Sequence, residues 1–349
     1  MKNLPEIDLE FLLEFLVGLL NTPSPTGYTD EAIEYTENIL AQYSEINVSR
    51  TRKGALVATI PGIKDDTPCG LTAHIDTLGA MVKEIKSNGR LKLTKIGGFP
   101  WNTVEGEGCT IITNNKKTVR GSILLSQASV HVYGSKLSEN KRDDDNMEIR
   151  LDERTNSEEE TRNLGIEVGD YISFDPRVEV RNGFIRSRHL DDKACVACVI
   201  TAVKALNEAG LKPKQKTTIL ISNFEEVGHG ASTGFPDEMV ELVAVDMAAV
   251  GEGQSSDEFN TTICVKDSGG PYHHGLSQKL RKIADEHGIP YKVDIYPYYG
   301  SDGEAFWRAG GNVAVALIGP GVDASHNYER THTDALHATT RWLLAYLLT

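Results

Sequence analysis

A stretch of about one hundred residues interrupts an otherwise α/β pattern, and it limits the possible folds more than any other feature of this 349-residue chain. Between residues 79 and 180 the chain consists of short alternating polar and apolar segments separated by glycine-containing turns, "ASVHVYG" among them. Only "SEEETRNLG" has a helical pattern there. Alternation with a period of two is typical of half-buried strands. We therefore predict a small β-barrel at 79–180, inserted into another domain.

The sequences on both sides of this insert alternate helices with apolar strands. Residues 8–45 contain two amphipathic helix patterns around a turn, and Thr29 or Asp30 could cap the second helix. After residue 188, apolar segments such as "TTILISNF" alternate with helical ones. Apolar runs of this kind predict strands of a largely buried sheet covered by helices. The expected architecture is one α/β domain, formed by 1–78 and 181–349 and split by the barrel.

Charge and cysteine content exclude several classes of function. The formal net charge of −14 argues against nucleic acid and anionic membranes as partners. The first twenty residues resemble a signal peptide only superficially, because acidic residues interrupt their apolar segment, and we expect a cytoplasmic protein. The odd number of five cysteines indicates free thiols in the core rather than a disulfide framework.

Side chains that could bind metals occur at or just after predicted strand ends in five places. These are His74 and Asp76, Asp191 and Asp192, Glu225 and Glu226, Asp246, and His326 with Glu329 and His332. Oxygen and nitrogen ligands without cysteine suit a pair of divalent ions such as zinc, cobalt or manganese. Each place alone also has a structural explanation: the His-x-Asp sequence as a buried polar pair, and the Asp-Asp sequence as a helix N-cap.

Strand geometry gives an expectation for two of these places. Neighbouring residues on a strand point to opposite faces, so Glu225 and Glu226 should differ in function, one binding a cation and the other remaining free as a base. Residues two apart share a face, so Asp76 could orient His74 by holding its second ring nitrogen.

The segments "AHIDT", "LDDKA" and "EEVGHGA", in this order, resemble the glutamyl-aminopeptidase and deblocking-aminopeptidase family of dinuclear metallopeptidases. That family includes archaeal tetrahedral aminopeptidases and proteins once called cellulases. The resemblance covers nearly the whole chain. It implies a three-layer, zinc-peptidase-like α/β catalytic domain with a mixed sheet, and hydrolysis of N-terminal residues from peptides. It also implies two divalent metal ions per subunit, zinc or cobalt, with manganese as an alternative.

The resemblance further implies a role for each candidate residue. The ligands divide into His74 and Asp246 for one metal, Glu226 and His326 for the other, and Asp191 for both. Glu225 would be the general base, and Asp76 would orient His74. The peptide between Asp191 and Asp192 is expected to be cis.

The C-terminal histidine ligand does not follow the family's spacing. The family's pattern is His-Ser-x-x-Glu, whereas this chain has "SHNYERTH", and counting back from Glu329 reaches Ser325 rather than a histidine. We favour His326, one position further on, as the ligand, with His332 as the competitor.

Two other functions account for parts of the pattern. A glycoside hydrolase would use the paired glutamates but leave His74, Asp246 and His326 without a function. A non-catalytic metal-binding scaffold would not need a spare glutamate beside a ligand glutamate. The resemblance implies peptide substrates and a homo-oligomer, with a dodecamer as one candidate, and a function of the insert in oligomerisation or substrate access. The preferred N-terminal residue stays open.

Overall fold

The computed structural model describes residues 4–349, and the chain folds into two compact units. Unit 1 contains the residues up to Asp76 together with Arg177–Thr349, and unit 2 contains Thr77–Pro176. The boundaries predicted from the sequence, at 79 and 180, lie within a few residues of this division.

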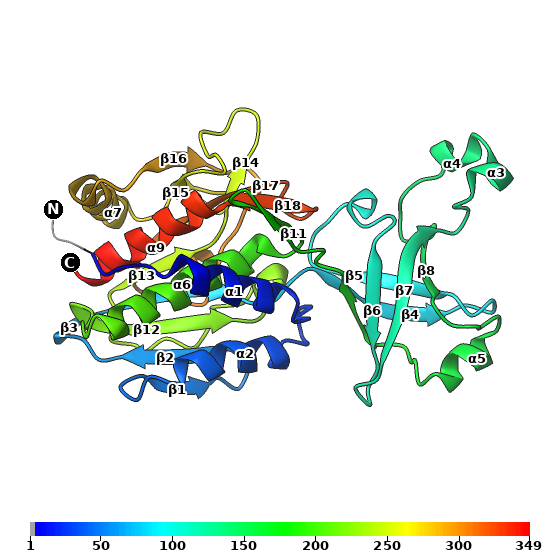
Figure 1. Cartoon of the computed structure of the whole chain (residues 1–349), viewed down its shortest axis with the longest axis horizontal. Helices are drawn as coiled ribbons and strands as arrows, with labels where there is room; N and C mark the ends of the chain where they lie inside the picture. Colours follow the sequence, from blue (N-terminus) through cyan, green and yellow to red (C-terminus); the bar gives the residue numbers. More distant parts are fainter. Residues whose placement is uncertain (1–3) are drawn as a thin grey trace. The chain divides into compact units, whose positions relative to one another are not determined.

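Unit 2 is a closed antiparallel barrel, with the strand order β4-β5-β8-β7-β6-β9 (Figure 1). Its strands are β4 (Gly79–Ile85), β5 (Leu91–Ile96), β6 (Gly108–Ile112), β7 (Thr118–Leu125), β8 (Met147–Leu151) and β9 (Tyr171–Phe174). Alternate residues of β7, including Val119, Ile123 and Leu125, are buried in the barrel core. The predicted β-barrel insert is confirmed.

The helices of unit 2 agree only partly with those predicted from the sequence. Helix α5 (Glu158–Asn163) forms where a helix was expected, and η1 (Trp101–Thr103) is a short 3₁₀ turn. The strand predicted at "ASVHVYG" is wrong, because Val130–Tyr133 forms the one-turn helix α3, followed by α4 (Lys136–Glu139). Val130 and Val132 are both exposed, so their alternation with a polar residue does not reflect a buried strand face.

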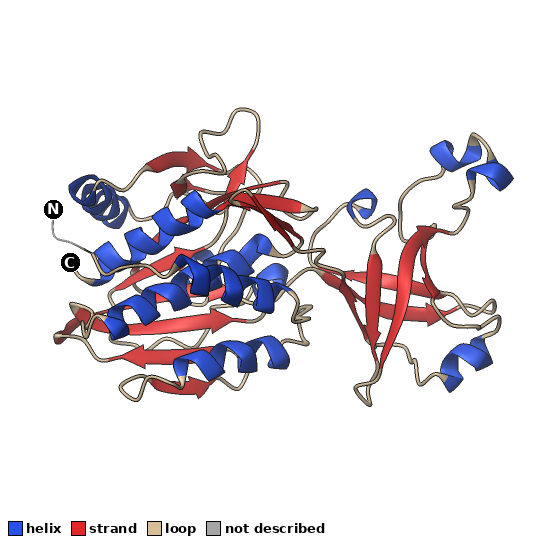
Figure 2. Cartoon of the chain, in the orientation of Figure 1, coloured by secondary structure: helices blue, strands red, loops and turns tan. Residues whose placement is uncertain are grey.

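Unit 1 contains a large mixed sheet (Figure 2). Its main path is β1-β2-β12-β3-β13-β17-β18-β11-β10, and β14, β15 and β16 attach beside β17. The strands are β1 (Asn47–Arg50), β2 (Leu56–Ile60), β3 (Lys64–His74), β10 (Glu179–Arg181), β11 (Phe184–Ser187), β12 (Gln215–Ser222), β13 (Glu241–Val245), β14 (Ala248–Val250), β15 (Thr261–Lys266), β16 (Tyr291–Ile295), β17 (Ala314–Asp323) and β18 (Glu329–His332).

Helices cover both faces of this sheet, which makes a three-layer domain. They are α1 (Leu9–Leu20), α2 (Asp30–Leu40), α6 (Leu190–Glu208), α7 (His274–His287), α8 (Asp302–Arg308) and α9 (Thr333–Leu347). Along β13, Val243 and Val245 join the core beneath α6 and α9, whereas Leu242 and Ala244 join a separate core beside α8. The predicted α/β class is confirmed. Within residues 4–349, no helix combines the length and apolarity needed to cross a membrane.

The centre of the sheet determines where functional side chains gather. β3 lies between β12 and β13 and runs parallel to both. The carboxyl ends of parallel strands meet at one edge of a sheet, where α/β proteins commonly bind ligands. β3 ends at His74, which is paired with Ser222 at the end of β12, and β13 ends at Val245.

Candidate metal centre

The residues predicted to bind metal converge at this edge, although they come from distant parts of the sequence. His74 ends β3, Asp191 lies at the start of α6, and Asp246 directly follows β13. Glu226 lies beyond β12, and His326 lies in the loop between β17 and β18. Potential ligand atoms of His74, Asp191 and Asp246 lie within 4.8 Å of one another, and those of Asp191, Glu226 and His326 do likewise.

Asp191 is common to both groups, and its two carboxylate oxygens face different histidines. Oδ1 lies 3.1 Å from Nε2 of His74, and Oδ2 lies 3.3 Å from Nε2 of His326. Two ligands of one tetrahedral zinc ion, each about 2.1 Å from it, are themselves about 3.4 Å apart. Burial alone would raise the pKa of Asp191, but the hydrogen bonds with His326 and His74 outweigh burial and lower it. Asp191 therefore lies between two positions at which a cation could be held.

The two adjacent glutamates do not lie on a strand. β12 ends at Ser222, and Glu225–Val227 forms the 3₁₀ turn η2, which Gly228 ends with a positive φ of 86°. The prediction that Glu225 and Glu226 lie on a strand and point to its opposite faces is therefore wrong, because strand pairing stops three residues before Glu225.

The side chains of these glutamates nevertheless face different histidines. Oε2 of Glu225 lies 3.7 Å from Nε2 of His74, and Oε2 of Glu226 lies 3.6 Å from Nε2 of His326. The Glu226 side chain is only 3% exposed, compared with 16% for Glu225. Glu226 is thus the more enclosed of the two, and Glu225 has more access to solvent.

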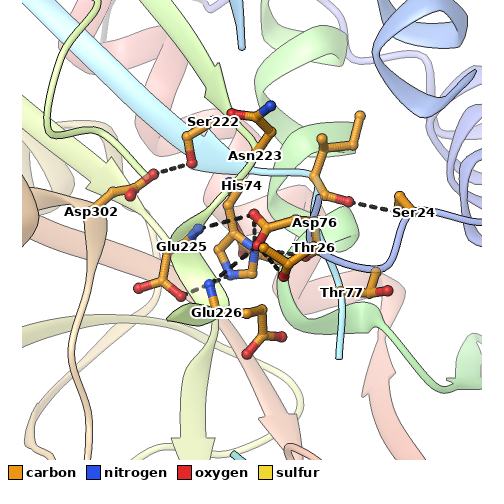
Figure 3. A network of polar contacts seen from close by, with 12 residues as sticks. Ser24, Thr26, His74, Asp76, Thr77, Ser222, Asn223, Glu225, Glu226 and Asp302 are labelled. Carbon is orange, nitrogen blue, oxygen red and sulfur yellow. Dashed lines mark hydrogen bonds and ion pairs between the residues drawn. The ribbon is translucent and has the colours of Figure 1, made fainter. Parts of the chain in front are cut away.

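Asp76 holds the turn that carries both glutamates (Figure 3). Its carboxylate accepts hydrogen bonds from the main-chain N–H of Glu225 at 3.1 Å and of Glu226 at 3.2 Å, and from the Thr26 hydroxyl at 2.7 Å. Nδ1 of His74 lies 3.0 Å from the main-chain oxygen of Asp76 but 3.6 Å from its carboxylate. A neutral imidazole that donates from Nδ1 directs its Nε2 lone pair toward Asp191.

Crowded acidic groups dominate the electrostatics of this site. Burial and the charge of Asp191 raise the pKa of Glu226 to about 8 and that of Asp246 to about 7. Burial also raises the pKa of Glu225 well above its usual value. Oε1 of Glu226 is buried without a hydrogen-bond partner among residues 4–349. Bound cations would reduce the repulsion between these carboxylates and would give the unpaired oxygen a ligand partner.

Asp192 lies directly before the regular part of α6, because Asp191 and Asp192 have non-helical backbone angles at a kink near the start of this helix. Its carboxylate contacts another part of the site. One oxygen of Asp192 accepts the main-chain N–H of His74 at 3.1 Å. The peptide between the two aspartates is cis, as the family resemblance implied.

The competing histidine, His332, caps a helix and packs against an aromatic ring. It is the N-cap of α9, and its Nδ1 accepts the main-chain N–H of Asp334 at 3.1 Å. Its ring packs edge-on against Phe184, with the centroids 4.8 Å apart. The geometry therefore brings His326, and not His332, to Asp191.

Two buried acids near the site have contacts that the sequence did not predict: Asp302, which was given no role, and Glu329, which was named only as a residue of the metal-binding type. Asp302 accepts a hydrogen bond from the Ser222 hydroxyl (Figure 3), and also from the Thr72 hydroxyl and the main-chain N–H of Ala231. Glu329, on β18, accepts two main-chain N–H groups from residues of the site itself. Spacing carries no signal for either contact, because most of these partners are remote in sequence.

Comparison with known proteins identifies the family. The family model for M42 glutamyl aminopeptidase matches residues 54–342. The chain belongs to the M42 family. This M42 protein is 49% identical over 336 residues to the Bacillus subtilis (strain 168) protein named "Putative aminopeptidase YhfE", covering 96% of each chain. The family predicted from the sequence is confirmed.

Solved structures show the same fold. The TET aminopeptidase from the archaeon Thaumarchaeota archaeon SCGC AB-539-E09 is 18% identical and superposes with a TM-score of 0.87, covering 96% of both chains. The TET1 peptidase of Pyrococcus horikoshii is 21% identical with a TM-score of 0.84, covering 97% of this chain and 99% of that one. Membership in M42 makes this chain a metal-dependent peptidase of an aminopeptidase family.

Proposed function

We propose that this M42 protein removes N-terminal residues from peptides with the help of two divalent metal ions. His74 and Asp246 would hold one ion, Glu226 and His326 the other, and Asp191 both. The proposal depends above all on Asp191, whose two oxygens face two different histidines at 3.1 and 3.3 Å. A carboxylate arranged in this way can bridge two cations, with one oxygen for each.

The donor set and its environment support this assignment. The groups are imidazole nitrogens and carboxylate oxygens, which suit zinc, cobalt or manganese. The raised pKa values of Glu226 and Asp246 and the unpaired oxygen of Glu226 are features that a positive charge would relieve. We propose zinc or cobalt as the resident ions, with manganese as an alternative.

The protein's own groups would perform the proton transfers. Bound ions would supply Lewis acidity, which acidifies a water molecule and polarises the scissile carbonyl. Glu225, which is not among the proposed ligands, would accept the proton of the attacking water on its carboxylate. It would then donate that proton to the leaving nitrogen of the peptide. Asp76 would hold Glu225 in place through the main chain, and its main-chain oxygen would orient His74.

We also propose that the chain assembles into a homo-oligomer, with a dodecamer as the leading candidate, through the barrel unit. Pyrococcus horikoshii TET1 can assemble into a tetrahedron or a large octahedral shell. In the present barrel, Val130 and Val132 are 56% and 71% exposed on α3. Native mass spectrometry of the wild-type chain and of Val132→Glu tests this proposal, and an unchanged distribution of assemblies would argue against α3 as a contact. The five free cysteines suit a reducing compartment such as the cytoplasm.

A metal-reconstitution experiment tests the enzymatic proposal. The protein is stripped with a chelator, and hydrolysis of a panel of aminoacyl substrates is then measured with zinc, cobalt or manganese. We expect activity to disappear on chelation and to return when two equivalents of metal are added. Activity that survives complete metal removal would instead favour a glycosidase-type mechanism with two carboxylates. Two bound metals without hydrolysis of any aminoacyl substrate would favour a non-catalytic scaffold.

A further inference from the structure

One carboxylate connects the main chains of two proposed ligands. Oε2 of Glu329 accepts the N–H of Asp191 at 3.1 Å, and Oε1 accepts the N–H of His326 at 3.0 Å. Glu329 lies on β18 and is 2% exposed, so these bonds are shielded from water. Asp191 and His326 belong to the same proposed metal position, with Asp191 Oδ2 and His326 Nε2 3.3 Å apart.

The loop that carries His326 is unusual in its backbone. His326 has a φ of 63° and Ala324 a φ of 58°, a left-handed conformation that residues with a Cβ rarely adopt. Such conformations persist only where surrounding contacts fix them. The hydrogen bond from the His326 N–H to Glu329 is one such contact. This hydrogen bond is also local, because its donor and acceptor are three positions apart in the sequence.

Few residue types can accept the N–H groups of both Asp191 and His326 from this position. Both oxygens of Glu329 accept N–H groups, one each. A glutamine has one acceptor oxygen and one donor NH₂ group, so one of the two N–H groups would face another donor. An aspartate keeps two acceptors but is shorter by one methylene group, so it reaches less far from β18.

We propose that Glu329 is a positioning residue that preorganises the metal position formed by Asp191, Glu226 and His326. It fixes the main chain of Asp191 and His326 so that their side chains face each other before a cation binds. Glu329 itself does not bind the cation. This inference rests on the two-metal site proposed above.

Metal titration tests the inference directly. Zinc binding to the chelator-stripped chain is measured by calorimetry, and cobalt binding by absorption spectroscopy, for the wild type and for Glu329→Gln. We expect the second equivalent of metal to bind 10- to 100-fold more weakly in Glu329→Gln, the usual effect of removing a residue that orients ligands. Glu329→Asp should show a smaller loss, because it restores two acceptor oxygens. The affinity for the first equivalent of metal should change less in both variants.

Two further variants make the outcomes distinguishable. Asp294→Asn is the matched control, since Asp294 is also buried and accepts the main-chain N–H groups of Ser255 and Ser256. It should lose stability without selective loss of the second metal. His326→Ala removes a proposed ligand. If His326→Ala keeps both metals, the two-metal site fails; if it loses one but Glu329→Gln binds both normally, only the inference about Glu329 fails.

Hydrogen exchange on the unmutated protein decides the question if the Glu329 variants do not fold. Preorganisation predicts that the amide of His326 is already protected from exchange in the metal-free protein. Free exchange of this amide until the second metal is added would overturn the inference, because the metal and not Glu329 would then order the loop.

Discussion

The main-chain N–H of Glu225 donates to the carboxylate of Asp76 at 3.1 Å, across 149 residues of sequence. The other carboxylate oxygen accepts the N–H of Glu226 at 3.2 Å. One buried acid therefore orients the proposed base and the proposed ligand beside it, while both glutamate side chains stay available for chemistry.

Replacing Asp76 by asparagine should test this orientation. One of the two N–H groups would then face an amide NH₂ group, and a buried unpaired donor costs about 1–3 kcal/mol. We expect this loss of stability in urea unfolding, and a fall in kcat that exceeds any rise in KM. Thr26→Val is the control, because it removes only the hydroxyl that donates to Asp76. An Asp76→Asn enzyme with unchanged kcat would refute the positioning effect.

Glu225→Gln should separate catalysis from metal binding. The amide cannot accept a proton, so we expect kcat to fall about 100-fold or more while two metals stay bound. Glu226→Gln should instead lose metal, because Glu226 is a proposed ligand. Metal content by elemental analysis and steady-state kinetics on the same samples distinguish the two. Normal turnover by Glu225→Gln would eliminate the base assignment.

The two candidate histidines should behave differently. His326→Ala should lose one of two metals with little change in unfolding free energy of the metal-free protein. His332→Ala should keep both metals but lose about 0.5–2 kcal/mol, since His332 caps α9. Metal stoichiometry and denaturant unfolding measure the two effects. Loss of metal in His332→Ala and not in His326→Ala would reverse the assignment.

The acidic site predicts a pH dependence for the metal-free protein. Glu226 and Asp246 have pKa values of about 8 and about 7, raised from those of the unfolded chain mainly by burial. Their protonated forms stabilise the folded state, and this contribution is fully present below about pH 4 and is lost as the pH rises through 7 and 8. Metal binding must displace these protons, so affinity should increase about tenfold per pH unit for each proton released.

Thermal unfolding with and without metal at pH 6, 7 and 8 measures this effect. We expect the increase in Tm caused by metal to grow with pH, because other titrating groups cancel in the difference. A metal-induced increase that is constant across this range would contradict the raised pKa values.

The sequence predicted the large-scale organisation because it depends on periodicity. Apolar runs such as "ELVAVDMA" predicted buried strands, and the alternating insert predicted the barrel, since both patterns persist over many residues. The helix α3 was missed because "VHV" alternates without being buried, and alternation over three residues cannot distinguish an exposed turn from a strand.

For the site, the sequence predicted which residues meet but not how they are held. The strand-end positions of His74 and Asp246 predicted that these two meet, because β3 and β13 are parallel neighbours, whereas Asp191 reaches them from the start of α6. The turn at Glu225 and the main-chain contacts of Asp76 and Glu329 were not predictable, because they join residues through backbone groups that every residue possesses. Only the three-dimensional path of the chain determines which N–H reaches which acid.

The position of the barrel within the chain has a consequence for folding. His74 and Asp191 are 117 residues apart, and the whole of unit 2 lies between them. If the insert is still a flexible loop, bringing these two residues together costs chain entropy, and this cost increases with the length of the loop. The pairing of parallel strands is slow for the same reason. A barrel that folds early would shorten the flexible loop. Metal-binding competence should therefore appear late in refolding, and later still in variants whose barrel is destabilised.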